Sequence, residues 1–178
     1  MNAKLFRCRI CGDPYIGVSL SSRCPFCGAP SKYIIDAHDW NTSEFDVELS
    51  ETTRKNLQTA LQLELSNTAF YVCAGNSAKA AGDEYMQTMF KALMKTEREH
   101  ASSICKFLKI SVPELETSSC QVDAVANSTE GHQRETRAVS SYARFRDEAV
   151  EPRMKEFFSA LVEIESDHID MHAAHASL

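Results

Sequence analysis

The chain has 178 residues with a net charge of -6; 43% of the residues are hydrophobic and 25% are charged. This composition is typical of a folded globular protein and excludes a disordered or collagen-like chain. The acidic balance argues against a nucleic-acid partner, which would need a basic surface. No apolar run approaches the ~18 residues of a membrane span, and no apolar signal-peptide segment precedes the first cysteines. We therefore expect a cytoplasmic protein with no membrane partner.

The first predicted unit, residues 1–37, is rich in cysteine, glycine and proline. It contains two Cys-x-x-Cys-Gly turns, at residues 8–12 and 24–28, and twelve residues separate the two Cys-x-x-Cys pairs. Two such turns bring four thiolates together in a tetrahedral site that suits Zn²⁺ or a single iron ion. The spacing alone does not distinguish a structural zinc ribbon from an iron centre. The predicted ligands of this metal-binding module are Cys8, Cys11, Cys24 and Cys27.

Residues 38–49 are predicted to be a linker, and residues 50–178 to form a mainly α-helical unit. Helical periodicity covers residues 50–80, 82–110, 129–150 and 152–176, with Pro152 placed in the first turn of the last segment. The first and third joints are short and predict antiparallel hairpins, whereas the second is long enough to travel the length of a bundle. We therefore predict a ferritin-like four-helix bundle with a long crossover between helices 2 and 3.

One glutamate interrupts the apolar stripe of each predicted helix. In helices 2 and 4 a histidine follows three residues later and lies on the same face. In helices 1 and 3 a tyrosine follows seven residues later. These pairs are Glu64 and Tyr71, Glu97 and His100, Glu135 and Tyr142, and Glu165 and His168. The glutamates of each hairpin are equally far from its turn, so the two halves are predicted to be related by a pseudo-twofold axis.

Four ionised carboxylates inside a bundle would each cost several kcal/mol if they were left unpaired. No lysine or arginine lies on these stripes, but two divalent cations would balance the charge, and mixed oxygen and nitrogen ligands suit iron or manganese. A single Glu-x-x-His is usually a solvated helix surface. Two of them, with two further glutamates, match the pattern of di-iron carboxylate bundles. The predicted ligands are Glu64, Glu97, His100, Glu135, Glu165 and His168.

The two cysteine turns and the helix motifs at residues 64–71, 97–100 and 165–168 together resemble rubrerythrin. The module-first order is similar to that of the reverse rubrerythrins, and the resemblance covers nearly the whole chain. It implies a non-haem di-iron peroxidase of oxidative-stress defence that reduces hydrogen peroxide to water. An Fe(Cys)4 centre would pass electrons to the di-iron site, with zinc as an alternative occupant of that centre. The six bundle residues would be iron ligands, and Tyr71 would donate a hydrogen bond to a ligand carboxylate.

The resemblance also implies partners. Reducing power would come from a separate nicotinamide-dependent reductase or a rubredoxin-type donor, since the chain contains no Gly-x-Gly-x-x-Gly fingerprint. Electron transfer across subunits in the family favours a homodimer.

The third helix departs from the family pattern. Ala138 stands where rubrerythrins have a second glutamate, three residues after Glu135. His132, three residues before Glu135, is an alternative ligand, although a surface histidine is the simpler interpretation. This departure keeps open an O2-dependent ferroxidase or oxidase of the bacterioferritin-like type. A non-catalytic electron carrier is the third alternative.

The remaining cysteines and histidines have simpler interpretations. The odd number of cysteines argues against a closed set of disulfides. We expect Cys73 and Cys105 to be core thiols and Cys120 to be an exposed thiol in the crossover. His172 and His175 are expected in a fraying C-terminal turn, with a proton path or an additional metal site as the alternative.

Overall fold

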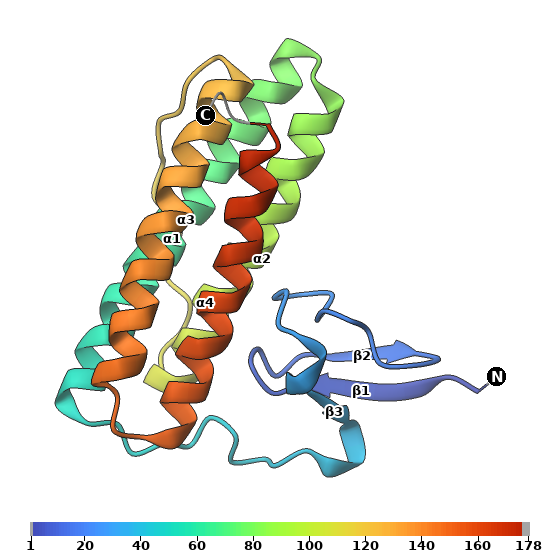
Figure 1. Ribbon diagram of the computed structural model, residues 1–178, viewed down its shortest axis with the longest axis vertical. Coiled ribbons are helices and arrows are strands. Elements are labelled where there is room, and N and C mark those ends of the chain that lie inside the picture. Colours follow the sequence, from blue (N-terminus) through green and yellow to red (C-terminus); the bar gives the residue numbers. More distant parts are fainter. Residues whose placement is uncertain (1, 176–178) are drawn as a thin grey trace.

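The computed structural model describes residues 2–175 (Figure 1). A small three-stranded sheet and two short 3-10 helices, η1 (Ser31–Tyr33) and η2 (Ala37–Asp39), precede four long helices. The strands are β1 (Lys4–Cys8), β2 (Pro14–Gly17) and β3 (Ile34–Asp36). The long helices are α1 (Glu51–Ala81), α2 (Glu84–Leu108), α3 (Ala124–Glu148) and α4 (Pro152–Ala173). Within the described residues, no helix combines the length and the apolar character needed to cross a membrane.

The sheet is antiparallel with the strand order β2-β1-β3. Phe6 of the central strand pairs with Tyr15 on one side and with Asp36 on the other. The rings of Phe6 and Tyr15 lie 5.4 Å apart and cover one face of the sheet. Because β1 ends at Cys8, the sheet fixes the start of the first cysteine turn.

Local signals explain most of the helix boundaries. The Ser50 side chain accepts a hydrogen bond from the amide of Thr53 at the start of α1, and α1 stops at Gly82, whose φ of 75° suits glycine. The start predicted for α3, at residue 129, was wrong. The helix begins five residues earlier, at Ala124, because Asp123 caps it through its side chain.

The four helices form the predicted ferritin-like bundle. Helix α1 packs on α2, and α3 packs on α4, each pair joined by a short turn. The crossover, residues 109–123, runs along the bundle from the end of α2 to the start of α3 (Figure 1). The inward faces carry aromatic side chains such as Phe90, Phe145 and Phe158, which are at most 1% exposed.

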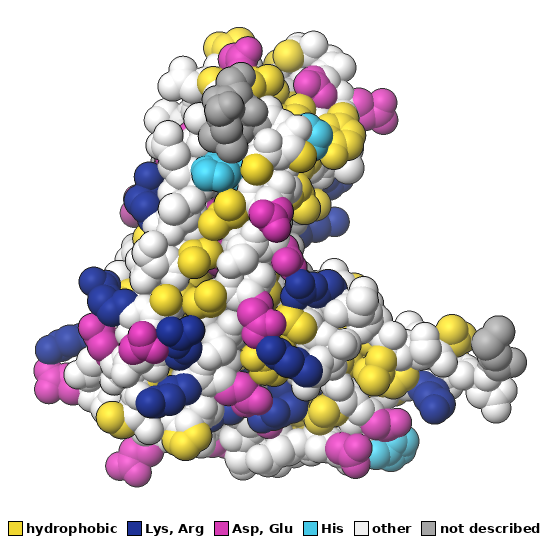
Figure 2. Space-filling model, viewed as in Figure 1, with side chains coloured by type: hydrophobic (Ala, Val, Ile, Leu, Met, Phe, Trp, Pro, Cys, Tyr) yellow, Lys and Arg dark blue, Asp and Glu magenta, His cyan; other side chains and the backbone are white. Residues whose placement is uncertain are grey.

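The N-terminal module lies beside the lower half of the bundle as drawn, next to α4 (Figure 1). Its cysteines and Ile10 belong to the same apolar cluster as Phe157 and Phe158 of α4, so one core continues from the module into the bundle. The Arg9 guanidinium donates to both oxygens of Glu156 at 2.8 and 3.0 Å. Figure 2 shows basic and acidic side chains intermixed along this border.

The linker contacts both units. The guanidinium of Arg7 lies 3.8 Å from the ring centroid of Trp40, and the ring of Phe45 lies 4.9 Å from that of Phe107 on α2. A Cβ atom at Gly12 would lie 2.8 Å from Phe45, which explains why a glycine with a φ of 84° stands there. Trp40 therefore holds the linker to the module, and Phe45 holds it to the bundle.

The interpretation of two cysteines was wrong. Cys73 of α1 and Cys120 of the crossover form a disulfide, with their Cα atoms 5.9 Å apart. The crossover passes beside α1 and brings together two residues separated by 47 positions, which their spacing in the sequence does not reveal. Cys105 is a buried free thiol, as expected.

Candidate metal centres

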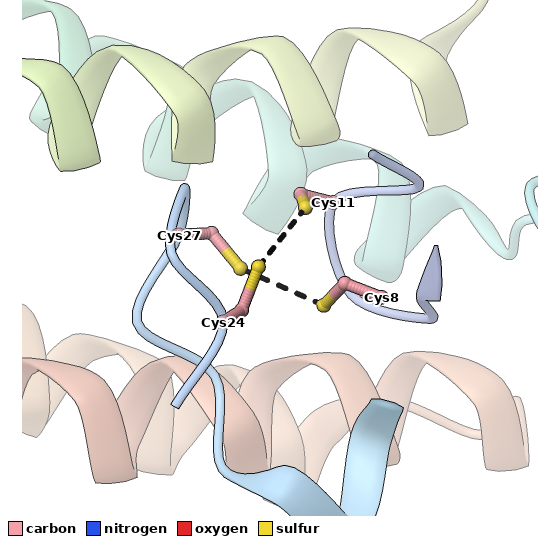
Figure 3. Close-up of side chains that lie close together, drawn as sticks. All are labelled: Cys8, Cys11, Cys24 and Cys27. Atoms are coloured by element: carbon pink, nitrogen blue, oxygen red, sulfur yellow. Dashed lines mark hydrogen bonds between the residues drawn. The ribbon is translucent and has the colours of Figure 1, made fainter. Parts of the chain in front are cut away.

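The first candidate centre is the cysteine cluster, defined as Cys8, Cys11, Cys24 and Cys27, which are all buried (Figure 3). The sulfurs of Cys8 and Cys27 lie 3.7 Å apart, and those of Cys11 and Cys24 lie 3.8 Å apart. A tetrahedron of sulfurs around a metal ion at about 2.3 Å has edges of about 3.8 Å. The four thiols therefore fit one tetrahedrally coordinated metal ion.

The backbone of each cysteine turn prepares this site. Gly12 and Gly28 have φ values of 84° and 76°, which reverse the chain directly after each pair of cysteines. The Gly12 amide donates to the carbonyl oxygen of Cys8 at 2.8 Å. The amide of Ile10 donates to the Cys8 sulfur at 3.4 Å. Such N–H···S bonds favour the thiolate form that binds a metal ion.

The second candidate centre lies inside the bundle. All six side chains that the sequence predicted as ligands meet there, and we call them the carboxylate cluster. They form two overlapping groups: Glu64, Glu97, His100 and Glu165, and Glu97, Glu135, Glu165 and His168. In each group the ligand atoms lie within 4.8 Å of one another. Glu97 and Glu165 belong to both groups, so they lie between two positions at which a metal ion fits.

Among the described residues, the inward-facing atoms of the carboxylate cluster form no hydrogen bond of good geometry. They include Glu64 Oε2, Glu97 Oε1, both oxygens of Glu165, and Nδ1 of His100 and His168. The two Nδ1 atoms approach Glu165 to 3.1 and 2.7 Å. Buried polar atoms are rarely left without partners. Convergent oxygen and nitrogen atoms on four acids and two imidazoles are the donor set of a two-cation site.

The pKa shifts within the carboxylate cluster also support a cation site. Burial raises the pKa of Glu97 and Glu135 well above the ordinary value, and the neighbouring carboxylates raise it further. Burial disfavours charge on His100 and His168, but the carboxylates outweigh it and raise the pKa of both imidazoles. Burial acts against ionised Glu165 as well, yet the two imidazoles beside it lower its pKa to about 2. Without metal ions the cluster therefore takes up protons, and cations at its centre would take the place of these protons.

Two tyrosines hold the outer carboxylates. The Tyr71 hydroxyl on α1 donates to Glu135 on α3, and the Tyr142 hydroxyl on α3 donates to Glu64 on α1. The exchange of partners between the two helices is what a pseudo-twofold axis produces. The sequence marked Tyr142 only as a repeat of Tyr71, and the equal spacing from each glutamate was the signal that it also contacts the site.

Sequence reasoning missed Asn67. Its side-chain nitrogen lies 3.4 Å from an oxygen of Glu97 and 3.4 Å from an oxygen of Glu135. Arg134 donates to the other end of the amide at 3.4 Å, which orients the nitrogen toward the acids. Asn67 lies three residues after Glu64 on the same helix face, and this spacing could have identified it.

The structure agrees with the interpretation of His132 and contradicts that of His172. His132 is half-buried and belongs to neither group of the carboxylate cluster, so the simpler interpretation of it holds. The fraying turn predicted around His172 was wrong. His172 is 0% exposed within α4 because Tyr71 and Ser128 hold its ring. His175 Nε2 lies 3.0 Å from the Tyr85 hydroxyl.

His100 connects the two candidate centres. Its Nε2 atom lies 3.0 Å from the carbonyl oxygen of Cys27, and its Nδ1 atom faces the carboxylate cluster. Nε2 must carry a proton because a carbonyl oxygen only accepts, so Nδ1 is the nitrogen that can bind a metal ion, once it has lost its own proton. One side chain of α2 therefore contacts the last cysteine turn and belongs to the carboxylate cluster.

The fold and the two clusters define a class of protein: a ferritin-like four-helix bundle with a buried carboxylate and histidine site, preceded by a small module with four cysteines. The family model named Rubrerythrin matches residues 55–176. The chain belongs to the rubrerythrin family, whose members are redox-active di-iron proteins. Neither the curated proteins nor the solved structures that were compared with it include a match.

Proposed function

We propose that this protein is a non-haem di-iron peroxidase that reduces hydrogen peroxide to water and receives its electrons through an Fe(Cys)4 centre. The observation that carries the proposal is the position of His100 between the cysteine cluster and the carboxylate cluster. A structural zinc ribbon has no need to contact a buried carboxylate site. A one-electron centre that supplies electrons to such a site must lie in contact with it, because electron transfer requires short, packed contacts.

The proposal assigns one iron ion to the cysteine cluster and two to the carboxylate cluster. In the latter, Glu97 and Glu165 would bind both ions because each belongs to both groups. His100 and Glu64 would complete one position, and His168 and Glu135 the other. The residue list of the second site matches the pattern of one glutamate from each of two helices and Glu-x-x-His from the other two.

The reaction consumes one peroxide molecule, two electrons and two protons, and yields two water molecules. Two ferrous ions, when bound, supply both electrons together and so avoid the release of a hydroxyl radical. The chain itself holds protons close by: the hydroxyls of Tyr71 and Tyr142 each donate to a carboxylate of the cluster. Rings such as Phe90 and Phe158, both 0% exposed, keep bulk water away from the site.

The wider role follows from the same proposal. The enzyme would act in oxidative-stress defence in the cytoplasm, as a homodimer. A nicotinamide-dependent reductase or a rubredoxin-type protein would reduce the Fe(Cys)4 centre. The cysteine turn at residues 24–28 includes Phe26, which is 39% exposed, so the module presents surface to such a donor.

Stopped-flow mixing tests the function. The iron-loaded, fully reduced protein is mixed with hydrogen peroxide and, separately, with O2, while absorbance follows the oxidation of each centre. We expect peroxide to oxidise the di-iron site faster than O2 does, followed by oxidation of the Fe(Cys)4 centre. Faster oxidation by O2 would refute the peroxidase assignment.

A matched pair of cysteine variants tests electron delivery. Cys24→Ser removes a thiolate of the cysteine cluster, whereas Cys105→Ser changes a buried free thiol outside it. We expect Cys24→Ser to lose steady-state peroxide turnover but to keep a single oxidation of a chemically reduced di-iron site. Cys105→Ser should retain both. Normal steady-state turnover in Cys24→Ser would exclude the proposed electron route.

One observation favours a second candidate, the O2-dependent ferroxidase or oxidase. Three residues after Glu135, the helix face carries Ala138, which is buried, and the six residues of the carboxylate cluster include no second acid from α3. A six-ligand site of this kind also suits an enzyme that oxidises ferrous iron with O2. The stopped-flow comparison separates the two functions.

A further inference from the structure

Tyr71 is held from two sides. Its hydroxyl donates to Glu135, and its oxygen also lies 2.8 Å from Nε2 of His172. Because the single phenol proton is used toward Glu135, the second contact requires a proton on Nε2. Nδ1 of the same ring then accepts from the Ser128 hydroxyl, 3.0 Å away. The three hydrogen bonds form one column that runs from Ser128 through His172 and Tyr71 to Glu135.

The surroundings of His172 keep its ring neutral and fixed. The residue is 0% exposed, and burial lowers its pKa to about 3. Its ring stacks on Tyr71 at a centroid distance of 5.7 Å and an interplanar angle of 14°, and it also contacts Phe90. A neutral imidazole has one N–H group, so its partners determine which nitrogen carries the proton.

Gly131 of α3 makes the room that His172 occupies. A Cβ atom at position 131 would lie 2.4 Å from Cε1 and 2.5 Å from Nε2 of the His172 ring. A glycine inside a helix costs about 1 kcal/mol relative to alanine. In α3, glycine therefore stands at the position where a side chain would displace the imidazole of His172.

The other half of the bundle lacks this arrangement. Ser128 and Gly131 lie seven and four residues before Glu135, and His172 lies seven residues after Glu165. At the same distances from Glu64 and Glu97, the other half of the bundle has Leu57, Ala60 and Ile104. All three of those residues are apolar and 0% exposed. Both tyrosines have phenylalanine rings as neighbours, but among the described residues the Tyr142 hydroxyl is hydrogen-bonded to Glu64 alone. Of the two tyrosines, Tyr71 is the one that is joined to a polar column.

We propose that His172 is a positioning residue for the carboxylate cluster: its Nε2–H fixes the Tyr71 hydroxyl as a hydrogen-bond donor to Glu135. The two ends of the cluster are then chemically distinct in spite of the pseudo-twofold axis. The inference rests on the proposed ligand role of Glu135 but not on the identity of the oxidant.

The first test reads the tautomer of His172 without any assay of activity. Zinc-loaded protein with ¹⁵N-labelled histidine is studied by NMR, because zinc gives sharp spectra. We expect a proton on Nε2 and none on Nδ1, unchanged between pH 5 and pH 8. A proton on Nδ1, or a doubly protonated ring, would overturn the proposal whatever reaction the enzyme catalyses.

The second test uses two substitutions at the same position. His172→Ile installs the residue of the other half, and His172→Gln keeps an N–H group near the place of Nε2. At equal metal content we expect His172→Ile to lower kcat about tenfold with KM unchanged, measured with whichever oxidant reacts faster in the stopped-flow comparison. His172→Gln should restore most of it. Unchanged kcat in His172→Ile would overturn the proposal. If that variant does not fold, the tautomer measurement decides.

A double-mutant cycle tests the steric link to Gly131. Gly131→Ala should displace the imidazole and lower kcat about as much as His172→Ile does. The double variant Gly131→Ala/His172→Ile should be no worse than Gly131→Ala alone, because Ala60 and Ile104 already form such a pair in the other half. Fully additive losses would show that position 131 acts independently of the ring and would contradict the proposal.

Discussion

The disulfide between Cys73 and Cys120 offers the most direct quantitative prediction. It closes a loop with a sequence separation of 47 residues. For a loop of that length, the loss of chain entropy in the unfolded state corresponds to about 4 kcal/mol at 25 °C. The double substitution Cys73→Ser/Cys120→Ser should therefore lower the free energy of unfolding by about 4 kcal/mol.

The native state should change little in this variant. Ser77 of α1 donates to the carbonyl oxygens of Gln121 and Val122, both at 3.1 Å, and Asn127 holds Gln121 through two bonds of 2.8 Å. These contacts keep the end of the crossover beside α1 without the disulfide. The stability difference should therefore arise mainly in the unfolded chain.

Urea unfolding followed by circular dichroism measures the effect, with both proteins loaded with zinc to the same extent. With an m value of roughly 2–3 kcal/mol/M, the midpoint should fall by roughly 1.5 M. Reduction of the unsubstituted protein should lower its midpoint to the same value and should leave the variant unchanged. A loss below about 1 kcal/mol would refute the chain-entropy argument, and free thiols at both positions would refute the disulfide itself.

Further predictions concern the metal centres and the module. Glu97→Ala should lose the metal ions of the bundle and the thermal stabilisation that they provide. Glu84→Ala, an exposed change on the same helix, should keep the metal ions and the stabilisation. Metal analysis and melting curves measure these two properties. The raised pKa values of Glu97 and Glu135 stabilise the metal-free fold below about pH 4, and this stabilisation falls as pH rises through the folded pKa values. Glu165 acts oppositely only toward about pH 2. His172, whose pKa is lowered to about 3, also acts oppositely, but only below about pH 6.5 and as one group against the two carboxyls. The urea midpoint of metal-free protein should therefore fall from pH 5 to pH 8, and a rising midpoint would contradict the argument. Gly28→Ala forces a side chain into a φ of 76° with its Cβ 3.2 Å from an α4 isoleucine, so stability should fall by roughly 1–2 kcal/mol in unfolding experiments.

The fold could be predicted because residue types recur with a regular period along the long helices. Apolar positions recur with the helical period, and the polar exceptions, such as Glu64 and Glu135, recur at equal distances from the turns. The six residues of the carboxylate cluster could therefore be brought together without coordinates. The cysteine turns were equally local, since glycine follows each pair of thiols directly.

The parts that could not be predicted depend on contacts between distant segments. The disulfide depends on the path of the crossover, and the contact of His100 with the Cys27 carbonyl depends on how the module packs against the bundle. Asn67 could have been found by its helical spacing. The burial of His172 could not, because the glycine that admits its ring lies on another helix, 41 positions earlier in the chain.

The two connections to the carboxylate cluster enter at opposite ends. Cys27 contacts His100, which groups with Glu64, whereas the column through Tyr71 and His172 reaches Glu135, which groups with His168. If the proposed function holds, electrons arrive at one metal position and the oriented hydroxyl serves the other. A pseudo-symmetric bundle alone would give the two positions the same properties. The module on one side and the polar column on the other remove that equivalence, and they do so through residues that leave the six cluster side chains unchanged.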